Sequence, residues 1–155
     1  MIPVDADVSA LSRQLEDAPV AFTSPDMADP VLAEQLTEVV AHESTAVIVS
    51  GPGNPAHLRD LGQAMLDGTD FSTVIVRGPG TGAVVSEEHS RAAIETSRDA
   101  LLAEPDYVAG VAEFLTGAQS FSVNWAAAAA AIIGCVVVIA VCAWLSARGQ
   151  ARRLE

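Results

Sequence analysis

Apolar residues recur in two patterns along the first 117 residues, and each pattern predicts a different kind of element. Stripes of apolar residues at three- and four-residue spacing predict amphipathic helices. Short runs rich in valine and isoleucine, bounded by turn residues, predict buried strands. Helices are expected over residues 6–17, 30–43, 54–68, 86–104 and 106–116. Strands are expected over 45–50, 72–77 and 82–86, with a candidate short strand at 20–23 inside the loop 18–29.

Capping residues set several of these boundaries. Asp29, followed by a proline, is typical of a helix start. Gly117 predicts the end of the last helix. Ser86 is expected to cap the N-terminus of the long helix 86–104. Acidic residues follow in the first turn of that helix, where the helix dipole favours negative charge. Side chains three and four apart should form a solvated ladder of charge pairs along that helix: Glu87, Arg91, Glu95 and Arg98.

The order of the elements predicts the fold class. A strand, a helix and a second strand, with helices on either side, indicate a small α/β sandwich. The strands 45–50 and 72–77 are expected to be parallel, joined by a right-handed crossover. Residues 82–86 should pair back on the second strand. We therefore expect an acidic α/β domain over residues 1–117, which is long enough to bury a core without disulfides or metals.

Residues 125–145 read WAAAAAAIIGCVVVIAVCAWL, and this apolar run contains no charged side chain. As a helix it would be about 31 Å long, close to the roughly 30 Å hydrocarbon core of a bilayer. Tryptophans lie near both ends, where indoles favour the headgroup region. We expect a linker over 118–124 and one C-terminal transmembrane helix over 125–147, its apolar run extending from Trp125 to Leu145.

Flanking charges predict the orientation of this span. Arg148, Arg152 and Arg153 follow it in a short basic tail, 148–155, whereas the twenty residues before it contain no basic side chain. The positive-inside rule then places the tail in the cytoplasm and the acidic domain outside the plasma membrane. The first residues do not have the basic and apolar pattern of a cleavable signal. A cytoplasmic domain with a tail anchor therefore stays open as an alternative.

Charge excludes several classes of function. Residues 1–124 carry five arginines and nineteen carboxylates, and an acidic surface repels the phosphates of nucleic acids. All eight basic residues are arginines, which excludes a Walker A loop and lysine Schiff-base chemistry. Within the predicted span, the pairs Ala127/Ala131 and Ala130/Gly134 are small residues four apart, a spacing typical of helices that associate in lipid. Self-association through Ala127, Ala131 and Gly134 therefore stays open.

Candidate ligands for a metal are few. The three histidines are scattered and both cysteines lie in the predicted span, so a zinc site is not expected. The excess of carboxylates leaves weak binding of a divalent cation open, with Asp70, Glu87 and Glu88 as the candidates. We expect no other cofactor and no catalytic residue. The glycine-rich stretches 51–54 and 77–82 are expected to be a helix-capping turn and a hairpin turn.

The pattern of elements resembles the TPM-type domain. The stretches that carry the resemblance are TAVIVS, PAHLRDLGQAMLDG, D-x-x-T-V-I-V and GAVVSEEHSRAAIE, followed by the apolar run. More closely, residues 30–147 resemble a family of small single-span membrane proteins of mycobacteria and corynebacteria with a divergent domain of this type. The resemblance implies an α/β/α sandwich outside the plasma membrane and a role in the cell envelope, linked to peptidoglycan hydrolases.

Two functions stay open. The first is a non-enzymatic envelope protein, whose anchored acidic domain binds or positions a partner, such as another membrane or cell-wall protein. The second follows from the resemblance, because TPM relatives are credited with weak phosphatase activity and divalent-cation binding. This sequence has GPGTG where relatives have charged residues, so no catalytic residue is carried over.

Overall fold

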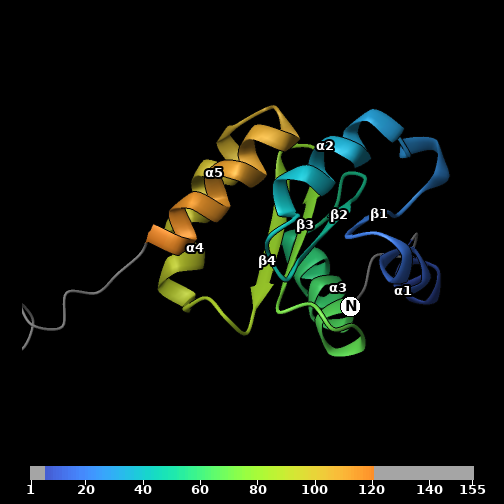
Figure 1. The fold of residues 1–155 in the computed structure, drawn as a ribbon, viewed down its shortest axis with the longest axis horizontal. Coiled ribbons are helices and arrows are strands. Elements are labelled where there is room, and N and C mark those ends of the chain that lie inside the picture. Colours follow the sequence, from blue (N-terminus) through green and yellow to red (C-terminus); the bar gives the residue numbers. More distant parts are fainter. Residues whose placement is uncertain (1–5, 121–155) are drawn as a thin grey trace, which may run out of the picture. The chain divides into compact units, whose positions relative to one another are not determined.

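One four-stranded sheet organises residues 6–120, the part of the chain that the computed structural model describes (Figure 1). The strands lie in their chain order, β1-β2-β3-β4. The first three are parallel to one another and the fourth is antiparallel to β3. The strands are β1 (Val20–Phe22), β2 (Thr45–Val49), β3 (Thr73–Gly78) and β4 (Thr81–Ser86).

The predicted parallel pair and the hairpin are both confirmed. Val47 of β2 lies opposite Ile75 of β3 in the parallel register. The hairpin between β3 and β4 turns at Pro79 and Gly80, and Gly80 has φ 63°. Proline followed by a glycine with positive φ is the signature of a type II turn, which explains the glycine at this position. The candidate strand at 20–23 is also confirmed, since Val20–Phe22 is the edge strand β1.

Helices connect and cover the strands. A side-chain cap starts each of the five α-helices among the described residues. For example, Asp29 accepts from the backbone amides of Val31 and Leu32, Asn54 from that of Ala56, and Ser90 from that of Ala93. Each cap satisfies an amide that has no partner inside its own helix. The helices are α1 (Val8–Asp17), the short 3-10 helix η1 (Pro25–Met27), α2 (Pro30–Val40), α3 (Pro55–Gly68), α4 (Arg91–Ala103) and α5 (Tyr107–Ser120).

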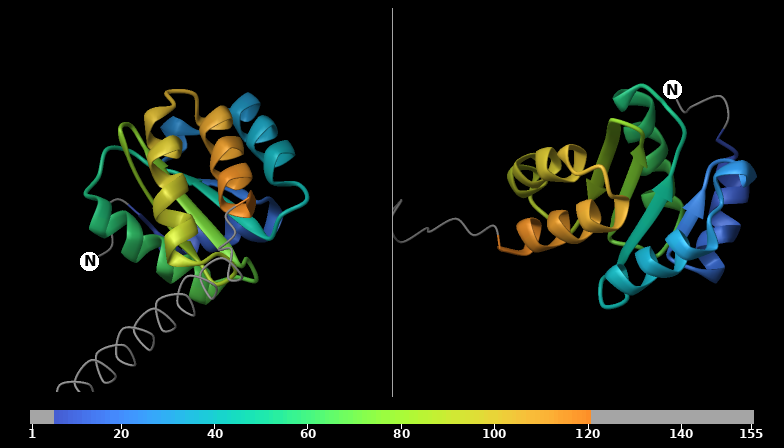
Figure 2. Two further views of the ribbon diagram at one scale, coloured as in Figure 1. Left: turned by 90° about the vertical axis from the view of Figure 1, so that its left-hand side faces the viewer. Right: turned by 90° about the horizontal axis from the view of Figure 1, so that it is seen from above.

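The sheet is buried on both faces, which confirms the α/β/α sandwich (Figure 2). Helices α1 and α3 cover one face, where Leu11 and Leu61 pack against Ile48 of the sheet. Helices α2, α4 and α5 cover the other face, where Phe114 packs on the side of Ile75. Because both faces are buried, β2 and β3 are buried along their whole length.

The start of α4 was predicted wrongly. Strand β4 extends to Ser86, which pairs with Thr73, and α4 begins only at Arg91 with Ser90 as its cap. The hydroxyl of Ser86 does accept from two following amides, but within the connection. Ser86 and Ser90 are both suited to cap a helix. Because Ser86 pairs with Thr73 as the last residue of β4, Ser90 caps α4. Glu87 therefore lies outside the helix, and the predicted ladder is reduced to the Arg91–Glu95 ion pair and a 4.0 Å contact between Arg98 and Asp99.

The predicted end of the last helix was also wrong, because α5 continues past Gly117 to Ser120. A Cβ at Gly117 would lie 2.7 Å from the hydroxyl of Ser97 on α4. The glycine thus permits close approach of α4 and α5 instead of stopping the helix. Consequently, the first three residues of the predicted linker 118–124 belong to α5.

One arginine is enclosed beneath the turn between α4 and α5. Arg77 of β3 is 3% exposed, and its Nη2 donates to the carbonyl of Glu104, which ends α4. Its guanidinium carbon lies 4.6 Å from the centroid of the Tyr107 ring. Burial lowers the pKa of Arg77, whereas Tyr107, Glu104 and Asp106 oppose that shift. A cation at a helix C-terminus is favourable, so this arginine ties the α4–α5 turn to the sheet.

The predicted transmembrane helix 125–147, with Trp125, Leu145 and the tail arginines, lies outside the described residues. None of the helices within residues 6–120 combines the length and the apolar character needed to cross a bilayer.

Gly110 of α5 provides the test of packing around Arg77. A Cβ at this position would collide with Nη1 of Arg77 and lie 3.0 Å from the carbonyl oxygen of Leu101. We expect Gly110→Ala to lower the free energy of unfolding by about 1–3 kcal/mol, as overpacking of a tight core does. Chemical denaturation of the full chain in detergent, followed by circular dichroism, measures the change.

The matched control is Gly68→Ala at the end of α3, where a Cβ meets nothing within 4 Å. Alanine is the better helix former by about 1 kcal/mol, so this variant should be as stable as the parent or more stable. Equal destabilisation by both substitutions would contradict the close packing of Gly110 against Arg77.

Candidate functional site

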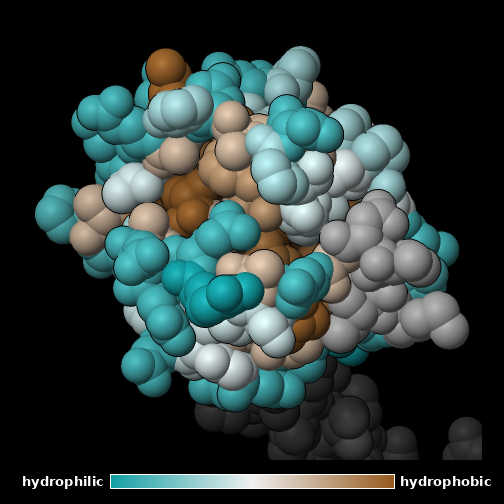
Figure 3. Space-filling view, turned by 90° about the vertical axis from the view of Figure 1, so that its right-hand side faces the viewer, coloured by the Kyte–Doolittle hydropathy of each residue, from teal (hydrophilic) through white to brown (hydrophobic). Residues whose placement is uncertain are grey.

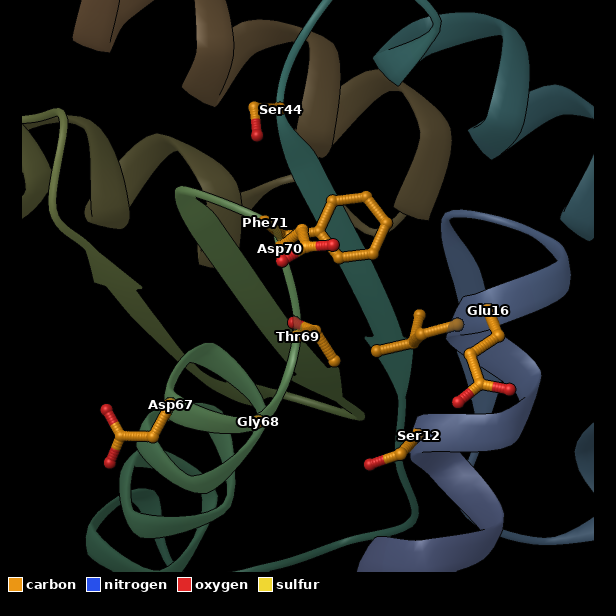
Figure 4. Close-up of a pocket in the computed structure, with 9 residues that line it drawn as sticks. Ser12, Glu16, Ser44, Asp67, Gly68, Thr69, Asp70 and Phe71 are labelled. Carbon is orange, nitrogen blue, oxygen red and sulfur yellow. The ribbon is translucent and has the colours of Figure 1, made fainter.

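Among the described residues, one open hollow with charged side chains lies where β2 and β3 begin. This amino-end pocket has a volume of about 670 Å³ and is lined by residues of α1, of the end of α3 and of the connection to β3. Figure 4 shows Glu16 on α1, Asp67 at the end of α3 and Asp70 in the connection, so the three carboxylates come from three separate parts of the wall.

The structure separates the three predicted metal candidates. Asp70 lines the amino-end pocket. Glu88 is engaged by a serine: the Ser72 hydroxyl lies 2.9 Å from its Oε2 and 3.1 Å from the carbonyl oxygen of Ser44. Glu87 is exposed, and its backbone amide donates to the carbonyl of Ser72. Within residues 6–120, no three His, Cys, Asp or Glu side chains form a group that could hold a metal ion. These residues do not fit a metal centre as they stand.

The second hollow is the β4 groove, about 470 Å³ in volume, which runs along the outer edge of the sheet between α3 and α4. Figure 1 shows these two helices on opposite sides of β4. Its floor is residues 82–86 of β4. Charged side chains line its walls: Arg59 from α3, and Arg91, Glu95 and Arg98 from α4.

Arginines are concentrated in this groove. Three of the five arginines in residues 1–124 line it, against a single carboxylate, although the domain as a whole is strongly acidic. Arg91 donates to Glu95 over 2.9 Å, and both side chains are exposed. The hydrogen bond and charge of Arg91, followed by the charges of Arg98 and Arg59, lower the pKa of the Glu95 carboxyl. Arg59 on α3 thus acts electrostatically on a carboxylate of the opposite wall, together with the two arginines of α4.

The floor of the groove is a sheet edge with backbone groups facing outward. Thr81 pairs with Gly78 across the two-residue turn, and paired residues then alternate along an antiparallel ladder. By this alternation, Gly82, Val84 and Ser86 turn their amide and carbonyl groups away from β3. The β4 groove therefore combines hydrogen-bond donors and acceptors along its floor with arginines along its walls.

The opposite edge of the sheet is closed. Gln14 of α1 lies beside Phe22 of β1, and its side-chain amide donates to the carbonyl of Phe22 at 3.2 Å and accepts from its amide at 3.0 Å. A hollow of about 420 Å³ beside this contact is lined by Leu11, Phe22 and Pro25, among others. Figure 3 shows that this side of the molecule is mostly hydrophilic, with apolar side chains in recesses. Gln14 therefore occupies the outward backbone groups of Phe22, which an added strand would need.

The sequence did not predict the β4 groove. Arg91 and Arg98 were assigned to a solvated ladder of charge pairs, and Arg59 lies more than thirty residues before them. The only available signal was that three of the five arginines of the acidic domain fall on the two helices that flank the last strand. The stretch 51–54 is, as predicted, a turn that ends in the cap Asn54.

The environment of Glu95 yields a test of the groove's electrostatics. Since arginines lower its folded-state pKa, Glu95 adds stability above its unfolded-state pKa, and that contribution is lost as the pH falls through the lower, folded value. We expect Arg91→Gln to raise the Glu95 pKa most, and Arg59→Gln to raise it less. Carboxyl-detected NMR titration measures the shifts. Arg13→Gln, on α1, is the control, and an unchanged Glu95 pKa in Arg91→Gln would refute the arrangement.

We compared the whole chain with protein-family models, curated proteins and solved structures. No curated protein and no solved structure matches it. The family model described as membrane protein Rv1476 matches residues 1–155. Because this match extends over the full sequence, the chain belongs to the membrane protein Rv1476 family.

Proposed function

We propose that this membrane protein is a non-enzymatic anchor whose acidic domain binds or positions a partner protein in the cell envelope. The observation that carries the proposal is the β4 groove. An open sheet edge flanked by three arginines, on an otherwise acidic domain, is a surface suited to a specific protein contact. Membership in a membrane protein family supports the anchor.

Finer features of the proposal come from the sequence. The apolar run 125–147 would be the anchor, with Arg148, Arg152 and Arg153 in the cytoplasm and the acidic domain outside the plasma membrane. The element order and the three layers are compatible with a divergent TPM-like domain, and a partner in cell-wall or peptidoglycan-hydrolase assembly follows from that resemblance. Ala127, Ala131 and Gly134 would permit self-association of the anchor.

An introduced cysteine tests both the side and the partner. Ser24, which precedes η1, is half-buried and its side chain does not cap that helix. Intact cells carrying Ser24→Cys would be treated with a membrane-impermeant, cleavable cross-linker that joins cysteine to lysine. Because the chain has no lysine, none of its side chains offers an amine to this cross-linker, and a cross-link to another copy of the chain could form only at an α-amino group, which peptide mapping of the adduct would identify. We expect a discrete adduct with another envelope protein, in a membrane fraction that only detergent releases.

Two controls accompany this experiment. The parent protein, whose cysteines lie in the predicted span, should give no adduct. Gln150→Cys in the predicted tail should also stay unreactive until the cells are opened. Reaction of Gln150→Cys but not Ser24→Cys in intact cells would reverse the orientation. Recovery of the chain without detergent would reject the anchor. Because Ser24 follows β1, at the opposite edge of the sheet from the groove, Gln63→Cys in the groove wall is labelled in parallel, and labelling of both variants without any adduct would reject the partner.

Weak divalent-metal-dependent phosphatase activity of the TPM type is the alternative, and the carboxylates in and near the amino-end pocket are the observation in its favour. Under the preferred proposal, calorimetry of the full chain in uncharged detergent should detect no binding of Mg²⁺ or Ca²⁺ at millimolar concentration. Binding that is lost in Asp70→Asn but kept in Asp26→Asn, together with phosphoester hydrolysis that is lost in the same variant, would establish the alternative.

A further inference from the structure

We propose that the β4 groove binds an extended, acidic segment of a partner protein, which joins the sheet as a fifth strand beyond β4. The carboxylates of that segment would lie against Arg59, Arg91 and Arg98. This inference rests on the proposed function and specifies the chemistry of the partner.

The backbone of β4 argues for a peptide. Gly82, Val84 and Ser86 offer both donors and acceptors at a two-residue repeat, and another extended backbone matches that repeat along its whole length. Phosphodiester and sulfate groups accept hydrogen bonds but donate none at neutral pH, so they would leave the carbonyls of this edge unpaired. A strand added along the six residues of β4 would span about 20 Å.

The walls of the groove argue for acidic side chains. Successive side chains of an added strand point to opposite faces of the sheet, one set toward α3 and the other toward α4. Arg59 lies on the α3 side, whereas Arg91 and Arg98 lie on the α4 side, so carboxylates of both sets would meet a guanidinium. Arginine pairs with carboxylates through two parallel hydrogen bonds, which adds geometric selectivity.

The net charge of the domain does not prevent this contact. At physiological ionic strength the Debye length is about 8 Å, so distant carboxylates are screened and the arginines of the groove dominate locally. Glu95 is the single acidic residue that lines the groove, and Arg91 already neutralises part of its charge. A second copy of this chain is a poorer occupant, because pairing of two β4 edges would bring two sets of arginines together.

Fluorescence anisotropy of the full chain in uncharged detergent, at about 0.15 M salt, tests the proposal. The probe is a fluorescein-labelled peptide of eight residues in which pairs of acidic residues alternate with pairs of valines, so that each face of the added strand carries carboxylates. We expect saturable binding. Arg59→Gln, Arg91→Gln and Arg98→Gln should each weaken it by about two- to fivefold, the effect of one exposed ion pair, and Glu95→Gln should strengthen it by a similar factor. Arg13→Gln, an exposed arginine beside the closed β1 edge, is the matched control and should change nothing.

Two altered peptides separate charge from backbone pairing. A version with asparagine and glutamine in place of the acids should bind at least tenfold more weakly. A version N-methylated on two adjacent central residues should also lose binding, because one methyl then faces the edge in any register. Undiminished binding of either version would overturn the proposal. Tighter binding of inorganic polyphosphate than of the peptide, or an arginine-dependent dimer in light scattering, would overturn it as well.

Failure here is distinguishable from failure of the proposed function. If Ser24→Cys yields an adduct but the acidic peptide does not bind, the partner contacts another surface and only the added strand is rejected. If no adduct forms from Ser24→Cys or from Gln63→Cys in the groove wall while the peptide binds as expected, the groove is confirmed as a peptide site and the proposed position of the partner in the envelope is rejected.

Discussion

A sheet that is buried on both faces can gain or lose partners only at its two edges, and this constraint shapes the described part of the molecule. Helices α1 and α3 cover one face and α2, α4 and α5 cover the other. The edge at β1 is closed by the side-chain amide of Gln14, which pairs with both backbone groups of Phe22. The edge at β4 has instead a groove with arginines on both walls. Closing one edge and leaving the other open gives the domain a single direction in which its sheet can extend.

The wall that α4 contributes depends on how α4 and α5 are fixed to the sheet. Arg77 holds their connecting turn from below through the carbonyl of Glu104 and the ring of Tyr107. Gly110 and Gly117 let α5 approach Arg77 and α4 closely. Among the described residues, Nε and Nη1 of Arg77 have no hydrogen-bond acceptor, so the cation is stabilised by one carbonyl and one aromatic face. The position of α4, and therefore of Arg91 and Arg98, depends on these buried contacts between Arg77, α4 and α5.

Local pattern predicted most of the fold, because runs such as TAVIV and caps such as Asp29 act within a few residues of themselves. The predicted helix ends were wrong where a contact between residues far apart in the sequence set the boundary. Pairing of Ser86 with Thr73 moved the start of α4 to Arg91, and packing on Ser97 made Gly117 an interior residue of α5. The candidate site was less predictable still. Asp70 precedes β3, whereas Glu87 and Glu88 follow β4, and the three carboxylates have different surroundings. The arginines that line the β4 groove come from two separate helices.

Amide hydrogen exchange along β4 tests the open edge most directly. In the full chain, NMR in uncharged detergent would compare Val84, whose amide should face the groove, with its neighbour Val85, whose amide should pair with β3. The account predicts fast exchange at Val84 and slow exchange at Val85, and slow exchange at Phe22 that becomes fast in Gln14→Ala. Exchange at Val84 as slow as at Val85 would mean that the β4 edge is already occupied, and would contradict the account.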